Sequence, residues 1–241
     1  MFSTVKKNFL YNSKFEKYFL YYLIILFGFS IFYLTKKHDV GNDSTIAEWI
    51  INYSGGFTKR GIVGHIAILI SEMSRANLRD VILFLQITTL AFYYILLFIF
   101  FKNIKINKVL ILSIFTPIFI LYPVAEIEVL ARKEVFIFIF FITYILIENL
   151  LIRRIYQIFV ISLAVLIWEP VVFYFPFFLA IDIFKYKFEK FDKKFFVNLF
   201  FYVPSILVAL FIALNPIEPE NHMIMENYLK INFNENCYTA C

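Results

Sequence analysis

The sequence is poor in charged residues, in glycine and in cysteine. Only 17% of its 241 residues are charged, whereas a soluble domain has about 25%. The six glycines and seven prolines are too few for a collagenous or low-complexity chain. Cys237 and Cys241 are the two cysteines, too few for a disulfide framework or a cysteine metal site. The sequence therefore excludes those classes and argues against a soluble domain.

Hydrophobic and aromatic side chains take the place of the missing charges. They make up 61% and 21% of the chain, with 33 Phe and 16 Tyr. A soluble fold of this size could not bury so much apolar surface in one core. The net charge is +5, but Lys and Arg flank apolar runs instead of forming one basic face. We therefore interpret them as topology determinants, predict an integral membrane protein, and expect no nucleic-acid partner.

Several apolar runs are long enough to cross a bilayer, which takes roughly 20 helical residues. They cover residues 18–35, 80–101, 108–125, 135–152 and 195–214. The first run is expected to be a retained anchor, because it is long and lacks a small-residue cleavage site. Residues 61–73 are apolar but too short to span. Residues 155–184 are apolar apart from an interruption at 168–170.

The basic clusters assign sides to these runs, because Lys and Arg collect in short cytoplasmic loops. A cytoplasmic N-terminus with 61–73 not crossing places most of the 23 basic residues inside. Residues 155–168 and 170–184 then form a hairpin with its tip outside. Each arm is only about 21 Å long, so the hairpin is short or re-entrant. We predict one all-α polytopic transmembrane domain over 1–241, with about seven crossings and the C-terminus outside.

The first outer loop, 36–79, is expected to contain two short interfacial helices. Thr45 and Glu48 fit a capping box. Apolar residues then recur at helical spacing through Trp49 and Tyr53, which indicates an amphipathic helix lying on the outer leaflet. Residues 62–73 are the second helix. The outer tail 215–241 ends at Cys241 in a polar stretch, from which we expect a polypeptide that continues further.

Candidate binding residues lie in this loop and in the next outer loop, 124–134. Four of the six glycines fall between 55 and 64, which indicates positive φ or a close approach at Gly55 and Gly56. Lys59 and Arg60 follow and could hold a phosphate. Arg132 and Lys133 could add two cations. The alternatives are a simple turn at the glycines, lipid phosphates on Lys59 and Arg60, and a solvated helix start at 132–134.

Three acids are candidates for catalysis. Asp39 and Asp43 lie just past the first span, and Glu169 lies within an apolar run, where an acid is costly and marks a functional site by default. Solvated caps or a loop tip are the alternatives. The three His are widely separated, so we predict no metal site and no cofactor. The carboxylates are compatible with a divalent cation, but no spacing requires one.

A first span followed by a long outer loop with acids and two interfacial helices resembles the GT-C class of polytopic glycosyltransferases. Residues 52–61 (NYSGGFTKRG) with 132–134 (RKE) also resemble multispanning proteins of bacterial surface-polysaccharide assembly. The resemblance implies sugar transfer from a polyprenyl-phosphate donor to a cell-envelope glycan or lipid, in the bacterial inner membrane. Asp39 or Asp43 would activate the acceptor, and Glu169 would be a second acid or bind the acceptor.

Two other classes stay open, and neither the sugar nor the oligomeric state follows from the sequence. In a transporter or flippase, the interruption at Glu169 and Pro170 would form the substrate or proton site. A non-catalytic membrane subunit is the third reading. Convergence of ionisable residues at the outer boundary favours a transferase, whereas convergence at the midplane favours transport.

Overall fold

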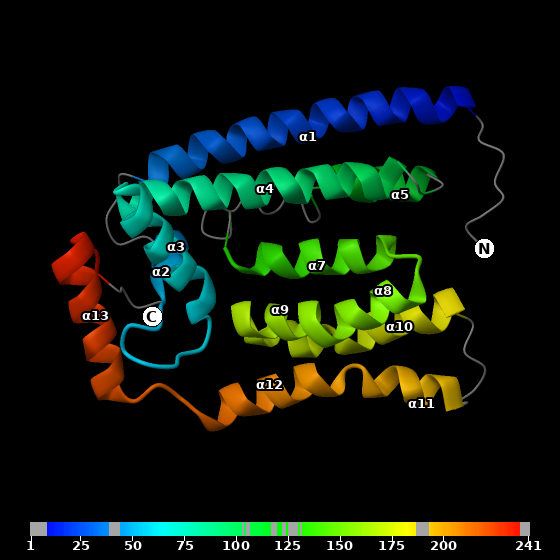
Figure 1. Cartoon of the computed structure of the whole chain (residues 1–241). Helices are drawn as coiled ribbons and strands as arrows, with labels where there is room; N and C mark the ends of the chain where they lie inside the picture. Colours follow the sequence, from blue (N-terminus) through cyan, green and yellow to red (C-terminus); the bar gives the residue numbers. More distant parts are fainter. Residues whose placement is uncertain are drawn as a thin grey trace.

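The computed structural model describes residues 9–38, 44–102, 104, 107–116, 120–121, 124, 130, 132–186 and 193–236, and every regular element in these ranges is a helix. The long helices are α1 (Phe9–His38) and α4 (Leu78–Lys102), which run antiparallel and in contact (Figure 1). Between them in sequence come α2 (Ser44–Ile50) and α3 (Gly61–Ser74). After α4 come α5 (Lys108–Phe115) and α7 (Glu134–Leu146).

The second half of the chain continues the same stack of helices. One rod consists of α8 (Leu150–Ile155), the π-helical turn η1 (Tyr156–Val160) and α9 (Ile161–Ile167). The chain then turns through the 3₁₀-helix η2 (Glu169–Tyr174) into α10 (Phe175–Tyr186). It returns along α11 (Lys193–Phe200) and α12 (Val203–Leu214), and α13 (Pro219–Phe233) follows.

The helices run between two ends of the molecule, which Figure 1 shows at left and right. The end at left, called here the α13 end, contains α2, α3, α13, the start of α7 and the turn from α9 to η2. The opposite end contains the start of α1, the end of α4 and the turn from α7 to α8. The described parts of the segments that the sequence assigns to the outer side thus lie at one end.

Among the described residues, four helical segments are long and apolar enough to cross a membrane: Lys14–His38, Leu78–Lys102, Leu150–Ile167 and Phe195–Leu214. Their outward faces carry large apolar side chains that the protein leaves exposed, such as Ile25 on α1, Ile95 on α4 and Leu210 on α12. A water-soluble monomer rarely exposes such extended apolar surface. The composition and these helices together indicate a membrane protein.

The predicted boundary between the fourth run and the hairpin is wrong. We expected an unbroken apolar helix over 135–152, with Arg153 and Arg154 in the loop after it. Residues 147–149 instead lie between two helices and are not helical. Asn149 caps α8 by accepting hydrogen bonds from two backbone N–H groups. The first arm of the hairpin is therefore the 18-residue segment Leu150–Ile167, which is not short. Of the run over 108–125, the structure describes one helix, α5, and few residues beyond it.

Arg153 lies inside a helix because it has partners there. Its side chain is fully buried and bonds Asp182 Oδ1 at 2.9 Å. It also donates to the backbone oxygens of Tyr144 and Ile147, at the end of α7, where backbone carbonyls lack intrahelical partners. Tyr144, Gln157, Asn198 and Tyr202 complete the buried network with hydrogen bonds to Asp182. This network ties α7, α8, α10 and α11 together.

The amphipathic helix predicted over the outer leaflet is inside the protein. Trp49 is 1% exposed and Ile50 is fully buried. Both pack with α3, α4, α9 and α13 in one apolar cluster, where the Trp49 ring also meets Phe136. The expectation failed because helical spacing identifies an apolar face but not what covers it.

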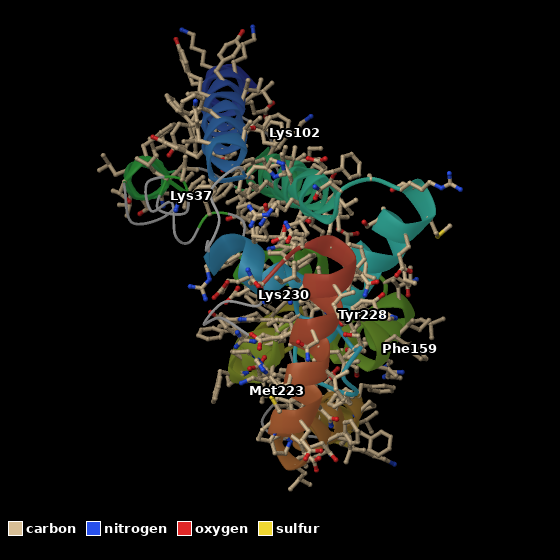
Figure 2. The ribbon with its side chains drawn as sticks, turned by 90° about the vertical axis from the view of Figure 1, so that its left-hand side faces the viewer. Lys37, Lys102, Phe159, Met223, Tyr228 and Lys230 are labelled. Atoms are coloured by element: carbon tan, nitrogen blue, oxygen red, sulfur yellow. The ribbon has the colours of Figure 1, made fainter. Side chains whose placement is uncertain are left out.

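The tail after residue 215 contains a helix that the sequence analysis left out. In Figure 2, α13 lies in front of the other elements, with Met223, Tyr228 and Lys230 along it. Met225 and Leu229 are its buried residues, and Glu235 beyond it pairs with Arg79 of α4. Pro219 at the first helical position and the i, i+4 spacing of Met225 and Leu229 were the signals that could have predicted it.

Candidate functional site

Seven charged side chains meet at the α13 end, in what we call the charged cluster. They come from four separate parts of the chain: α2, the loop before α3, the start of α7 and the start of η2. The members are Glu48, Lys59, Arg60, Arg132, Lys133, Glu134 and Glu169. Five of them, all but Glu48 and Glu134, were candidates from the sequence, and the structure brings those five together.

Arg60 is the hub of the charged cluster. Its Nε donates to Glu169 Oε2 at 2.7 Å and its Nη2 donates to Oε1 at 2.9 Å, a bidentate pair of the strong kind. Its Nη1 lies 3.7 Å from Glu48 Oε1. Arg60 also has φ of 62° at the N-terminus of α3. A side chain in this left-handed region costs roughly 1–2 kcal/mol, and such strain concentrates at functional sites.

Glu48 joins the two arginines of the charged cluster from the buried side. Its side chain is 5% exposed. Its Oε1 accepts a hydrogen bond of 2.7 Å from Arg132 Nη2 and lies close to Arg60. The capping-box interpretation did not predict this role. No local pattern could have done so, because Arg132 lies 84 residues further along the chain.

Lys133 contributes a cation that makes no direct ion pair with the carboxylates of the described residues. It is fully buried, and its Nζ donates one hydrogen bond of 2.7 Å to the backbone oxygen of Arg60. Within the described residues, no Asp or Glu oxygen lies at ion-pair distance from this Nζ. Burial lowers the pKa of the Lys133 ammonium to about 7, because removing a charge from water disfavours the charged form. Lys133 can therefore gain or lose a proton near neutral pH.

The pKa values of the two more exposed carboxylates of the charged cluster, Glu169 and Glu134, are shifted in opposite directions. Burial alone would raise the pKa of Glu169, but the hydrogen bonds and charge of Arg60, with the charge of Lys59, hold this pKa below its usual value. Burial raises the pKa of Glu134, with a further contribution from the charge of Glu48. Glu169 is therefore a stable anion at neutral pH, with its Oε1 3.9 Å from Lys59 Nζ.

Gly55 and Gly56 serve the packing of the chain on itself. A Cβ at Gly55 would lie 1.9 Å from the backbone oxygen of Asn221 in α13, and Gly56 has φ of +106°. The positive φ and the close approach expected from the sequence are both present. The close neighbour of both glycines is α13 of the same chain, and the cations that follow them lie in the charged cluster.

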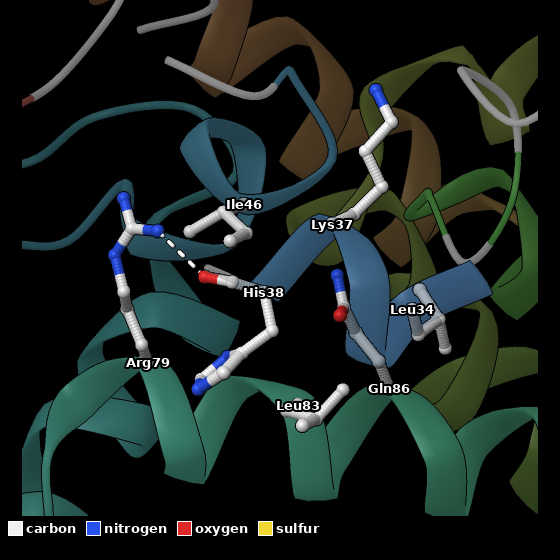
Figure 3. A pocket seen from close by; sticks show the side chains of 7 residues that line it. All are labelled: Leu34, Lys37, His38, Ile46, Arg79, Leu83 and Gln86. Carbon is white, nitrogen blue, oxygen red and sulfur yellow. Dashed lines mark hydrogen bonds between the residues drawn. The ribbon is translucent and has the colours of Figure 1, made fainter. Parts of the chain in front are cut away.

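Asp39 and Asp43 lie outside the described residues, but the residues on either side of them are placed. Asp39 follows His38, the last residue of α1, and Asp43 precedes Ser44, the first residue of α2. Figure 3 shows the pocket around His38, lined by Leu34, Lys37, His38, Ile46, Arg79, Leu83 and Gln86. His38 Nε2 is 2.9 Å from Asp80 Oδ1, and Arg79 donates to the His38 carbonyl at 2.8 Å. Both flanks of the segment are thus at the α13 end.

The part of the chain that the structure describes contains no group of three or more His, Cys, Asp or Glu side chains able to hold a metal ion. Comparisons with protein-family models, with curated proteins and with solved structures found no match for this chain. The chemistry of the site therefore rests on its geometry. Guanidinium groups held by a buried carboxylate and by partly exposed ones, beside a lysine that titrates near neutrality, are suited to binding an anion whose charge changes during a reaction.

Proposed function

We propose that this protein is a membrane-embedded transferase that moves a sugar from a polyprenyl-phosphate donor to a cell-envelope glycan or lipid acceptor. The single observation that supports it is the charged cluster, in which cations from two separate loops meet Glu48 and Glu169. That cluster lies at the same end as both flanks of Asp39 and Asp43. A donor with a lipid tail requires such a site at the end of a bundle of apolar helices, where its phosphate can leave the hydrocarbon.

The proposed membrane arrangement keeps the α13 end outside. The chain would cross about seven times in a bacterial inner membrane with a cytoplasmic N-terminus, as the distribution of Lys and Arg favours. Among the residues described, Lys102 and Arg154 lie toward the opposite end, whereas the acids Glu48 and Glu169 lie at the α13 end. In this orientation the donor phosphate and the acceptor meet on the outer side.

The reaction assigns a distinct task to each kind of side chain. Asp39 or Asp43 takes the proton of the acceptor hydroxyl, whose oxygen then bonds to the anomeric carbon of the sugar. The bond from that carbon to the phosphate oxygen breaks, and polyprenyl phosphate (or diphosphate) leaves with the electron pair. Arg60 and Arg132 stabilise the charge that develops on the leaving phosphate. A divalent cation is compatible with these acids but has no assigned role.

The transporter alternative depends on Glu169 acting alone in an apolar run. Glu169 instead pairs with Arg60 at 2.7 Å and lies 3.9 Å from Lys59. An acid held by two cations at one end of the bundle is better suited to an anion-handling site than to a midplane proton site. The transferase is therefore the function that we favour.

The test is product formation from a radiolabelled polyprenyl-linked sugar in membranes that contain the wild-type chain or single variants. Asp39→Asn or Asp43→Asn should lower the rate by about 10²- to 10⁴-fold, because Asn keeps the shape but accepts no proton. Arg132→Ala should weaken donor use, and Arg132→Lys should restore part of it. Glu72→Gln, at the same end but outside the charged cluster, is the matched control. Equal rates for wild type and the Asp39/Asp43 double variant would refute the mechanism.

A further inference from the structure

We infer that Glu169 is an internal counter-ion which occupies Arg60 until a phosphate or diphosphate group displaces it. The inference rests on the proposed function in one respect: the displacing phosphate is taken to be the headgroup of the lipid donor. It goes further in assigning the resting state of the site: a closed ion pair that the substrate itself opens. It also changes the expected role of Glu169 from catalytic acid to competitor for the donor site.

The two carboxylates that lie beside Arg60 differ in access to solvent. Glu48 lies behind the arginines with a side chain only 5% exposed. Glu169 contacts Nε and Nη2 of Arg60, whereas Glu48 lies near Nη1. The Glu169 side chain is 25% exposed and lies beside Lys59, which is 59% exposed. An incoming anion therefore reaches Arg60 from the side of Glu169 and Lys59. The pair that can open without burying a lone charge is Arg60–Glu169, since Glu48 stays to neutralise the arginines from behind.

Arg60 is held in place independently of Glu169. Its backbone is fixed by the left-handed turn into α3 and by the hydrogen bond from Lys133 Nζ to its carbonyl oxygen. Its Nη1 lies near Glu48. The guanidinium would thus keep its position when Glu169 leaves. Its Nε and Nη2, the two donors that Glu169 occupies, have the spacing that binds two oxygens of one phosphate.

The charge balance of the charged cluster also favours an incoming anion. Lys59, Arg60, Arg132 and Lys133 face the carboxylates of Glu48, Glu134 and Glu169, which leaves an excess of cations when Lys133 is protonated. Among the described residues, Lys133 is the cation of the cluster whose Nζ makes no direct ion pair, although Glu48, Glu134 and Glu169 lie near enough for their charges to act on it, and it is fully buried. A buried cation without a direct ion pair is costly. A phosphate dianion in place of the Glu169 monoanion would compensate it.

Anion binding can be measured without turnover, with the full chain in phosphatidylcholine nanodiscs and inorganic pyrophosphate as the calorimetric probe. Glu169→Gln should bind pyrophosphate about fivefold more tightly than wild type, because the internal competitor is removed. Arg60→Ala should remove binding in both backgrounds. Glu72→Gln should leave the affinity unchanged. Equal or weaker binding by Glu169→Gln would overturn the inference.

A second measurement uses the wild-type chain, so that a folding defect in a variant cannot decide the outcome. Pyrophosphate should slow modification of Arg60 by phenylglyoxal and speed modification of Glu169 by a water-soluble carbodiimide. Opposite changes at the two residues are the signature of displacement. Protection of both, or of neither, would contradict it.

The source of the phosphate is tested by adding polyprenyl phosphate to the nanodiscs. If the lipid headgroup uses the site, it should weaken pyrophosphate binding to wild type and release Glu169 toward carbodiimide by itself. If only the soluble anion binds, the lipid should change neither signal, and the transferase proposal would fail although Glu169 still acts as counter-ion. If pyrophosphate leaves Glu169 unreactive while sugar transfer is observed, the transferase stands and the counter-ion role is wrong.

Discussion

At the scale of single residues, Arg60 and Lys133 depend on each other. Arg60 has a left-handed backbone that a non-glycine residue adopts at a cost, and its carbonyl oxygen is the acceptor for Lys133 Nζ. Lys133 in turn is buried where an ammonium group is poorly solvated. Both features raise the free energy of the folded protein, and proteins retain such features where a site needs them.

The buried Lys133 predicts how stability depends on pH. Its pKa is about 7 in the folded protein and 10.5 ordinarily, so the unfolded chain binds more protons between these values. The free energy of unfolding should therefore rise as pH increases from about 7 toward 10. The apparent Tm of the detergent-solubilised protein should rise over this window in wild type. Lys133→Met, which keeps the length of the side chain, should flatten that rise.

Lys230→Met is the matched control, because Lys230 is exposed on α13. The apparent Tm of Lys230→Met should change with pH as the wild-type Tm does. A wild-type slope in Lys133→Met would show that Lys133 keeps its proton across this range.

At the scale of elements, the sequence predicted helices where one property is enough to define them. Apolar length predicted the runs that became α1 and α4, and glycine clustering predicted the special backbone at Gly55 and Gly56. The sequence pattern could not locate the end of α7. Arg153 can lie within a helix because it pairs with Asp182, a residue 29 positions away that no local pattern identifies. The same limit applies to Glu48 and to the burial of α2, since both depend on what covers them.

The contact between the 51–60 loop and α13 predicts the effect of adding one methyl group. Gly55→Ala would put its Cβ 1.9 Å from the Asn221 backbone oxygen, and overpacking of this kind costs about 1–3 kcal/mol. It should lower the apparent Tm and make the α13 segment more susceptible to proteolysis. Gly28→Ala is the matched control, because its Cβ would have no neighbour within 4 Å. It should be neutral or stabilising by about 0.5–1 kcal/mol, since Ala favours a helix more than Gly does.

At the scale of the whole molecule, charge is divided between the two ends. The α13 end has the charged cluster, in which acids and bases lie side by side, together with the pairs Arg79–Glu235 and His38–Asp80. Toward the opposite end, Arg153 and Asp182 form a buried pair, and Lys102 is exposed. A count of charges along the sequence does not distinguish a buried, paired side chain such as Arg153 from an exposed one such as Lys102. The pairing of the charges, which only the structure supplies, therefore adds functional information that their count along the sequence lacks.

The two ends should be accessible from opposite sides of the membrane. Single cysteines at Arg75 and Asn215, both exposed at the α13 end, should react with a membrane-impermeant thiol reagent added outside intact cells. Cysteines at Lys102 and Glu148, exposed at the opposite end, should react only after the membrane is opened. The background carries replacements of Cys237 and Cys241, so that each signal comes from one position. Reaction of position 75 from outside and position 215 from inside would mean that an odd number of crossings separates α3 from α13, so that the two helices could not belong to one outer assembly. The charged cluster would then not be the place where an outer acceptor meets a lipid-linked donor, because α13 packs directly against the loop that carries Lys59 and Arg60.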